Sequence, residues 1–356
     1  KGIEQEVIEK IAWWLDVSRG EIEKNISVFP EIDRLNNILD TEVISYPEAL
    51  ARRIFHRILL VSSEPVRYMI TDTLKKFRQL VRKDLIEIEH CVFVALYQEL
   101  LNRMKIKPFN WKGHKGAILL CHDIDSKECY DFIPEILDLE SKYNFKSTFN
   151  LLTGWSYKVD KSLVKDIDAR GFEVGLHGWT HDIALGSRPK ARIKSELERA
   201  LDDISFKAIG FRAPAFSVTK TLLEVLSEIG IKYDGSMKTL SCYGQGVETC
   251  YPYRFPNIDI WEIPLTIQDD RIFRDLHLSC EEGVGVIKEL SKRIVDVNGV
   301  VVINTHLRLI KRKPKFYKDL LIWLDEYRNN AMISPMRDVY YIFDERFKKL
   351  KNEIKK

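Results

Sequence analysis

The stretch Leu120-Cys121-His122-Asp123-Ile124-Asp125 ends an apolar run with two acidic residues, and it decides how the rest of the chain is interpreted. Side chains alternate between the two faces of a β-strand, so Asp123 and Asp125 share one face. A strand that ends in Asp-x-Asp therefore places both carboxylates at one rim of a sheet.

A second polar motif follows further along the chain, where His177-Gly178-Trp179-Thr180-His181 carries two histidines in the pattern His-x-x-x-His. At the start of a helical turn, two histidines with this spacing fall on one face and bind one ion. Together with Asp125 they supply one carboxylate and two imidazoles to a divalent metal, which leaves Asp123 as a base. The pattern predicts a hydrolytic metal site with an open position for water.

From Gly116 onward, short apolar segments alternate with helical stretches. The expected strands are residues 117–121, 146–152, 172–176, 208–212, 231–234, 261–266 and 300–304. The expected helices are residues 128–143, 161–170, 189–204, 219–229, 281–295 and 314–329. This alternation predicts an α/β fold with a parallel sheet that closes, or nearly closes, into a barrel. The polar motifs fall at the carboxyl ends of its strands, where such barrels build their sites.

Three regions are expected along the chain. Residues 1–112 have apolar positions at helical spacing and form a helical N-terminal extension with no motif that indicates its role. Residues 113–335 form the barrel. Residues 336–356 form a charged C-terminal helical tail.

Composition excludes several classes of protein. Hydrophobic residues make up 45% of the chain and charged residues 31%, as in a soluble protein with a sizeable core. The 56 basic and 53 acidic residues nearly balance, so a nucleic-acid partner is not expected. There is no apolar run of about 18 residues, so a membrane span is not expected either. Composition does not indicate the oligomeric state.

Cysteines and termini bear on the cellular compartment. The six cysteines are too scattered for a disulfide framework, although Cys242 and Cys250 lie in one stretch and would pair in an oxidising compartment. No signal-peptide pattern is present, which favours a cytoplasmic location. The sequence begins at Lys1 rather than at Met, which leaves open that an upstream segment was removed.

Two further strand ends carry polar residues. Gly210-Phe211-Arg212-Ala213-Pro214 places Arg212 beside a rigid turn, where it either keeps a carboxylate ionised or forms a structural salt bridge in the barrel. The segment Val301-Val302-Ile303-Asn304-Thr305-His306 ends the last strand in a histidine that is able to reach across the barrel mouth as a proton donor.

Taken in order, these motifs resemble the polysaccharide deacetylases, the NodB-homology superfamily of carbohydrate esterase family 4. The matching segments are His122-Asp123-Ile124-Asp125, His177–His181, Arg212-Ala213-Pro214, Tyr233-Asp234-Gly235-Ser236 and Asn304-Thr305-His306. The resemblance covers roughly residues 115–330. The acidic pair departs from the usual adjacent one because Ile124 separates the two acids, which makes this an Asp-x-Asp variant.

The resemblance implies a distorted (β/α)7-type barrel that binds a divalent metal, with Zn²⁺ expected first and Co²⁺, Ni²⁺ or Mn²⁺ as alternatives. It implies that Asp125, His177 and His181 are the metal ligands. It also implies that Asp123 is the general base, Arg212 its charge partner and His306 the general acid. Asp234 and Glu262 are both candidates for orienting His306, and the choice between them stays open.

The function expected on these grounds is removal of an N-acetyl group from a sugar of a polysaccharide or glycoconjugate precursor. A metal polarises the carbonyl, Asp123 activates water and His306 protonates the leaving amine. Two alternatives remain: an amide or formyl hydrolase that acts on a substrate other than a polysaccharide, and a non-catalytic carbohydrate-binding barrel.

Overall fold

The computed structural model describes residues 92–354, with gaps at residue 106, residue 155, residues 240–246, residue 248 and residues 256–257. Most of the predicted N-terminal extension, residues 1–91, lies outside the described residues. So does Cys242, and its pairing with Cys250 therefore stays a prediction. The first described element is α6 (Val92–Met104), a helix whose Tyr97 hydroxyl donates to Asn298 Oδ1 at 3.0 Å.

The central feature is one curled sheet whose neighbouring strands are parallel, apart from the β6–β7 pair. Its strands are β1 (Gly116–Ile124), β2 (Thr148–Leu152), β3 (Glu173–Gly178), β4 (Gly210–Phe211), β5 (Tyr233–Asp234), β6 (Tyr253–Arg254), β7 (Trp261–Glu262), β8 (Ile267–Gln268), β9 (Val300–Thr305) and β10 (Ala331–Ser334). The order is β6-β7-β5-β4-β3-β2-β1-β9-β8, with β10 paired to β1. The prediction of a distorted (β/α)7-type barrel is confirmed.

The differences from the expected strands have local causes. The segment predicted at 261–266 is only Trp261–Glu262, after which Ile267–Gln268 forms β8. Pro264 lies between the two and has no N–H to donate, so the ladder cannot run through it. Strands β6, β8 and β10 were not predicted, and the first two have only two residues each, too few for a visible alternation.

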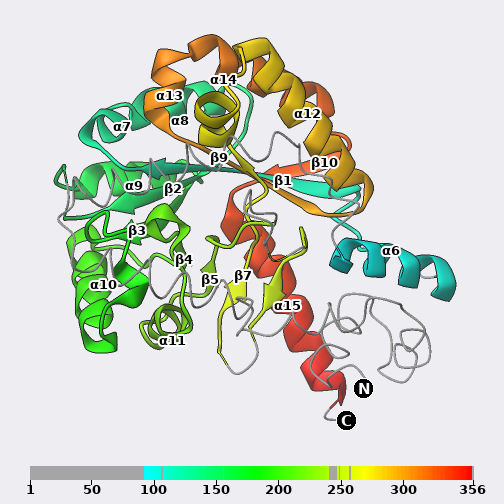
Figure 1. Cartoon of the computed structure of the whole chain (residues 1–356), viewed down its shortest axis with the longest axis horizontal. Helices are drawn as coiled ribbons and strands as arrows, with labels where there is room; N and C mark the ends of the chain where they lie inside the picture. Colours follow the sequence, from blue (N-terminus) through cyan, green and yellow to red (C-terminus); the bar gives the residue numbers. More distant parts are fainter. Residues whose placement is uncertain are drawn as a thin grey trace.

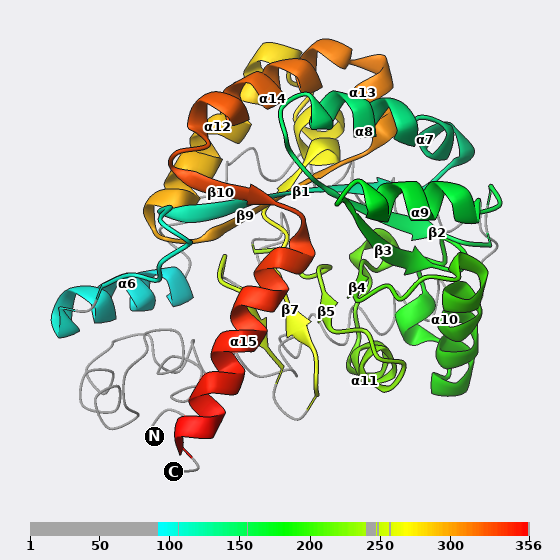
Figure 2. The same cartoon turned by 180° about the vertical axis from the view of Figure 1, so that it is seen from behind.

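Helices cover the outer face of the curled sheet (Figures 1 and 2). They are α7 (Lys127–Asp131), α8 (Ile133–Ser141), α9 (Lys161–Ala169), α10 (Lys190–Ile204), α11 (Lys220–Glu228), α12 (Cys280–Asp296), α13 (Leu307–Arg312) and α14 (Pro314–Tyr327), whereas the last helix, α15 (Met336–Ile354), packs at one end of the barrel. The predicted helix 128–143 divides into α7 and α8, with Pro134 in the first turn of α8, where the missing N–H costs nothing. The other predicted helices match to within a few residues.

Strand β1 is the centre of the core, and all nine of its residues are buried. One of its edges pairs with β9 from Ala117 to His122. The other edge is shared, because β10 pairs with its first half and β2 with its second half. A strand buried on both faces and on both edges fixes the position of any side chain that follows it.

Helix α15 lies across the amino ends of the strands. Its first backbone N–H groups donate to side chains at the starts of β2 and β3, with Met336 N on Thr148 Oγ1 at 2.9 Å and Arg337 N on Glu173 Oε2 at 2.8 Å. Further along α15, Phe343 packs edge-on against Trp261 of β7. This end of the barrel is therefore filled, and the polar strand ends lie at the opposite end. No helix in the described part of the chain is both long and apolar enough to cross a membrane.

The variant Leu119→Ala tests how much the burial of β1 contributes to the free energy of unfolding. Leu119 is fully buried, so removing its side chain should lower the free energy of unfolding by about 2–5 kcal/mol. The control is Ile322→Ala on α14, where the side chain is 39% exposed and a change within about 1 kcal/mol is expected. Urea denaturation followed by circular dichroism measures both, and similar losses in the two variants would contradict this description of the core.

Candidate active site

The site begins with Asp123, whose carboxylate is buried at the carboxyl end of β1. Its Oδ1 accepts a hydrogen bond from Asn150 Nδ2 of β2 at 2.9 Å, and its Oδ2 accepts one from Asn304 Nδ2 of β9 at 2.7 Å. Both neighbouring strands thus hold the carboxylate in one orientation. Each oxygen keeps a lone pair that the amide does not use, so Asp123 remains able to accept a further proton.

Gly175 of β3 makes room for this arrangement. A Cβ atom at this position would lie 2.3 Å from Asn150 Oδ1, well inside contact distance. A side chain at residue 175 would therefore push Asn150 away from Asp123. Gly175 therefore allows Asn150 to approach β3 closely, and Asn150 in turn holds the carboxylate of Asp123.

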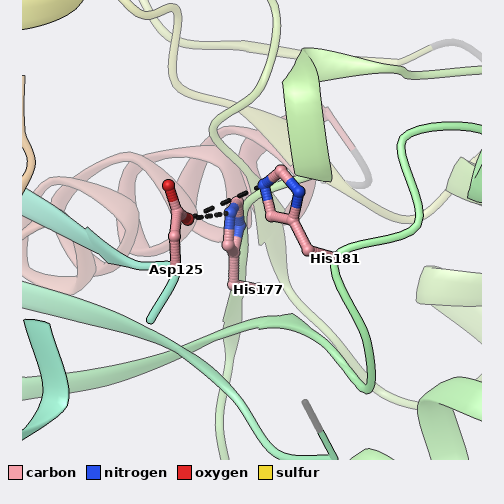
Figure 3. Close-up of side chains that lie close together, drawn as sticks. All are labelled: Asp125, His177 and His181. Atoms are coloured by element: carbon pink, nitrogen blue, oxygen red, sulfur yellow. Dashed lines mark ion pairs between the residues drawn. The ribbon is translucent and has the colours of Figure 1, made fainter. Parts of the chain in front are cut away.

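Asp125, His177 and His181 come together directly beyond β1 (Figure 3). Asp125 Oδ1 lies 3.2 Å from His177 Nε2 and 3.7 Å from His181 Nε2. One ligand atom from each residue falls within a common span of 4.8 Å. The structure thus brings together the three residues that the sequence analysis named as metal ligands.

The two histidines do not share a helix face, and that part of the prediction is wrong. His177 is on strand β3, and His181 is in the loop that follows it. Gly178 ends the strand with a φ of +116°, a conformation open to glycine, and the chain turns there so that His181 returns toward His177. A strand followed by a tight turn thus brings the two imidazoles together, as one turn of a helix would also have done.

The chemistry of the three side chains fits a divalent cation. His177 Nδ1 donates to the Arg212 carbonyl oxygen at 2.7 Å, so Nε2 is the nitrogen that faces Asp125 and is the one placed to bind a cation. Burial lowers the pKa of His181 to about 4, so this imidazole is neutral at pH 7. Asp125 Oδ1 is a buried oxygen that accepts no hydrogen bond of good geometry. A cation would satisfy that oxygen together with both imidazole nitrogens.

His306 follows β9 and faces the other oxygen of Asp125, with Nε2 3.4 Å from Oδ2. Its Nδ1 donates to Asp269 Oδ1 at 2.8 Å, and its backbone N–H donates to Asp269 Oδ2 at 2.6 Å. Asp269 therefore orients His306, and neither Asp234 nor Glu262 does. Asp269 was not predicted because β8, the strand that it follows, has only two residues; the available signal was the acidic pair Asp269-Asp270 shortly after the apolar Ile267.

Asp234 and Glu262 are engaged elsewhere. Asp234 Oδ1 accepts from Ser236 Oγ at 2.6 Å, and Glu262 Oε1 accepts from Met237 N at 3.0 Å. Burial and then the charge of Asp234 raise the pKa of Glu262 well above its ordinary value. The two acids are thus part of the buried wall of the barrel on strands β5 and β7.

Arg212 is fully buried after β4 and makes no direct hydrogen bond to Asp123. Its Nη2 lies 3.2 Å from Cys121 Sγ and 3.6 Å from Met336 Sδ. Its positive charge nevertheless contributes to lowering the pKa of Asp123. The charge-partner role therefore acts across space, and the Arg212 carbonyl has a second role in holding His177.

The ionised acids and the protonated histidine of the site stabilise each other's charges. Burial acts to raise the pKa of Asp123 and Asp125, but the neighbouring histidines outweigh it and both pKa values lie below the ordinary range. Burial acts to lower the pKa of His306, but Asp269 and Asp125 raise it well above the ordinary value. The carboxylates are therefore ionised and His306 is protonated in the metal-free protein at neutral pH.

A second group of possible ligands contains Asp269, Asp270 and His306. Both carboxylate oxygens of Asp269 already accept hydrogen bonds, from His306 and from the Asp270 backbone N–H. His306 Nδ1 is used in the same contact. These residues fit an oriented imidazole better than a second metal site.

Side chains on the opposite face of β1 take no part. His122 points outward, where its Nδ1 lies 2.7 Å from Thr305 Oγ1 and its Nε2 lies 2.9 Å from Glu140 Oε1. Tyr317 also donates to Glu140. This buried polar cluster attaches helices α8 and α14 to the sheet.

Comparison with known proteins agrees with the fold and the motifs. Residues 111–233 match the family model described as polysaccharide deacetylase. Among solved structures, a protein named as a polysaccharide deacetylase from Mycobacterium smegmatis is similar, with a TM-score of 0.58 and 16% identity over 67% of this chain and 94% of that one. The allantoinase Puue is similar with a TM-score of 0.52 and 12% identity over 65% and 91%. No curated protein sequence matches the chain.

At these identities the two structures show only that the fold is similar. Residues 111–233 therefore carry the sequence pattern of the polysaccharide deacetylases, in agreement with the family that the motifs resemble. This match supports the prediction of a hydrolase of the deacetylase type.

Asp269→Asn tests the control of His306. Losing the carboxylate charge should lower the pKa of His306, because burial then acts with less opposition. A raised pKa stabilises the folded protein below the ordinary histidine value and loses that effect as pH rises through the folded value, so the variant should be less stable near neutral pH. NMR titration of the imidazole in metal-free protein measures the shift. Asp325→Asn, on the exposed part of α14, is the control, and an unshifted His306 in Asp269→Asn would contradict the role of Asp269.

Proposed function

We propose that this protein is a metal-dependent deacetylase that removes an N-acetyl group from a sugar of a polysaccharide or glycoconjugate precursor. The observation that carries the proposal is the meeting of Asp125, His177 and His181 around one buried, unsatisfied carboxylate oxygen. One carboxylate and two imidazoles are a ligand set for Zn²⁺ that leaves a position open, and Co²⁺, Ni²⁺ and Mn²⁺ are the alternatives. When bound, such an ion polarises a carbonyl group and lowers the pKa of a bound water.

Asp123 is proposed as the general base. It is ionised, it is held rigidly by two amide groups, and it shares one face of β1 with Asp125. A carboxylate in this position takes a proton from the attacking water. Arg212 supports the ionised form through its buried positive charge, since Asp123 must be unprotonated before the reaction begins.

His306 is proposed as the general acid. An amine leaves poorly unless it is protonated, and His306 is the protonated imidazole on the opposite side of Asp125 from the two histidine ligands. Asp269 holds the proton on Nδ1, so the proton on Nε2 is the one directed to the leaving nitrogen. Asp269 therefore orients the imidazole ring and keeps it protonated, and His306 donates the proton to the leaving amine.

Asp125→Ala should abolish tight binding of a divalent metal and with it acetate release, because the remaining two imidazoles are a weaker ligand set. Metal analysis of purified protein and acetate release from N-acetylglucosamine oligomers measure the two effects. Asp131→Ala, an exposed residue on α7, should change neither. Full activity in Asp125→Ala, or wild-type protein that binds no divalent metal, would contradict the proposal.

Asp123→Asn and His306→Ala should separate chemistry from metal binding. Each should lower kcat by about 10²–10⁴-fold, the usual contribution of a general acid or base, while the bound metal stays near one ion per chain. Thermal denaturation checks that both variants remain folded. Loss of metal from either variant, together with loss of activity, would assign the residue to the ligand set instead.

The acyl group and the alternatives are tested with one panel. N-acetyl and N-formyl sugars, offered beside amides that contain no sugar, distinguish a sugar deacetylase from a formyl or general amide hydrolase. Binding of a glycan with no acyl release in the presence of metal would favour the non-catalytic barrel and contradict the proposed reaction.

A further inference from the structure

A pocket of about 360 Å³ lies beside the candidate metal site, and its lining is strongly basic. It is lined by Asp270, Arg274, Arg308, Leu309 and Arg312. Three guanidinium groups thus face one carboxylate. A volume of this size is within the range of small-ligand pockets.

One residue of the pocket, Arg308, also lies near the proposed reaction centre. Arg308 Nη1 lies 4.0 Å from Asp125 Oδ2, the same oxygen that faces His306 Nε2 at 3.4 Å. Arg308 and Arg312 are separated by one turn of α13, about 6 Å along the helix. A substrate whose acyl group is at Asp125 therefore extends by a short distance into the row of arginines.

Each of the three arginines has an acidic neighbour at 3.3 to 4.0 Å, and ion pairs that are exposed to solvent are weak enough for another anion to replace them. Asp270 lies 3.3 Å from Arg274, and Glu128 lies 3.7 Å from Arg312. Arg308 faces Asp125, whose charge a divalent cation would already compensate. The whole chain is nearly balanced at 56 basic and 53 acidic residues, yet residues 306–318 contain six lysines and arginines and no acidic residue.

The lining also argues against a neutral sugar as the occupant. Sugar rings are usually bound by stacking on aromatic faces, and none of the five lining residues is aromatic. Of the aromatic residues near the strand ends, Tyr233 and Trp261 are buried in the core, and Trp179 Nε1 donates to Asp203 on α10 while Arg199 stacks on its ring. Arginine forks match the geometry of a phosphoryl group, to which they donate pairs of hydrogen bonds.

We propose that this pocket binds a phosphoryl group carried by the substrate, so that the enzyme acts on a sugar phosphate or sugar diphosphate rather than on a neutral glycan. The inference rests on the proposed deacetylase function and narrows its substrate class. Arg274 and Arg312 bind the phosphoryl group at the outer part of the pocket, and Arg308 links that part to the reaction centre.

Calorimetric titration of metal-free protein with inorganic pyrophosphate tests the pocket without relying on catalysis. Wild-type protein should bind pyrophosphate, more weakly as salt is added, and Arg274→Gln and Arg312→Gln should each reduce the affinity about tenfold. The matched control is Arg328→Gln at the far end of α14, where the side chain is 43% exposed against 42% for Arg274. Equal binding by wild type and the Arg274→Gln/Arg312→Gln double variant, or binding of glucuronic acid but not of pyrophosphate, overturns the proposal.

Kinetics with metal present separate this inference from the proposed function. N-acetylglucosamine 1-phosphate should have a KM at least about tenfold lower than N-acetylglucosamine, and Arg312→Gln should remove most of that difference through KM rather than kcat. Equal acetate release from both sugars in all variants overturns the phosphoryl pocket and leaves the deacetylase. Arginine-dependent pyrophosphate binding with no acetate release from any sugar supports the pocket and overturns the deacetylase.

Discussion

Burial of two carboxylates at the end of one central strand is the constraint on which the site depends. A buried, unpaired carboxylate is costly, and a protein that keeps one ionised must surround it with donors or positive charge. Asp123 has two amide donors from the flanking strands, and Asp125 has imidazoles on both sides. The geometry of the barrel mouth reflects that requirement, because β2 and β9 each bring an amide to Asp123, β3 brings His177 to Asp125, and the residue after β8 holds His306.

The barrel contains buried acids in two different electrostatic settings. At the mouth, Asp123 and Asp125 face histidines and have lowered pKa values. Deeper in the wall, Asp234 and Glu262 face each other, and burial raises the pKa of both. Arg212 lies between these two groups of acids and contacts sulfur atoms rather than a carboxylate. The lowered pKa values keep the two acids at the mouth ionised, as a base and a metal ligand must be. The raised pKa values favour the protonated form of the two acids in the wall.

Most of the fold was predictable from the sequence because β1, β2, β3 and β9 are mostly apolar segments separated by helices with clear periodicity. What was not predictable were the short strands. Two-residue segments such as β6 and β8 have no period to detect, and Pro264 interrupts a run that otherwise resembles one long strand. The miss had a functional consequence, because Asp269, the partner of His306, follows one of those short strands.

The sequence by itself determined which residue types stand at the ends of the long strands, since alternation along β1 places Asp123 and Asp125 on one face whatever the barrel does. It also supplied the histidines and the arginine in the right order. Only the tertiary structure decided which of these side chains meet. The turn at Gly178 returns His181 to His177, the Arg212 carbonyl sets the tautomer of His177, and β8 brings Asp269 under His306. Contacts between residues far apart in the chain depend on how the sheet curls, and local periodicity has no information about that curl.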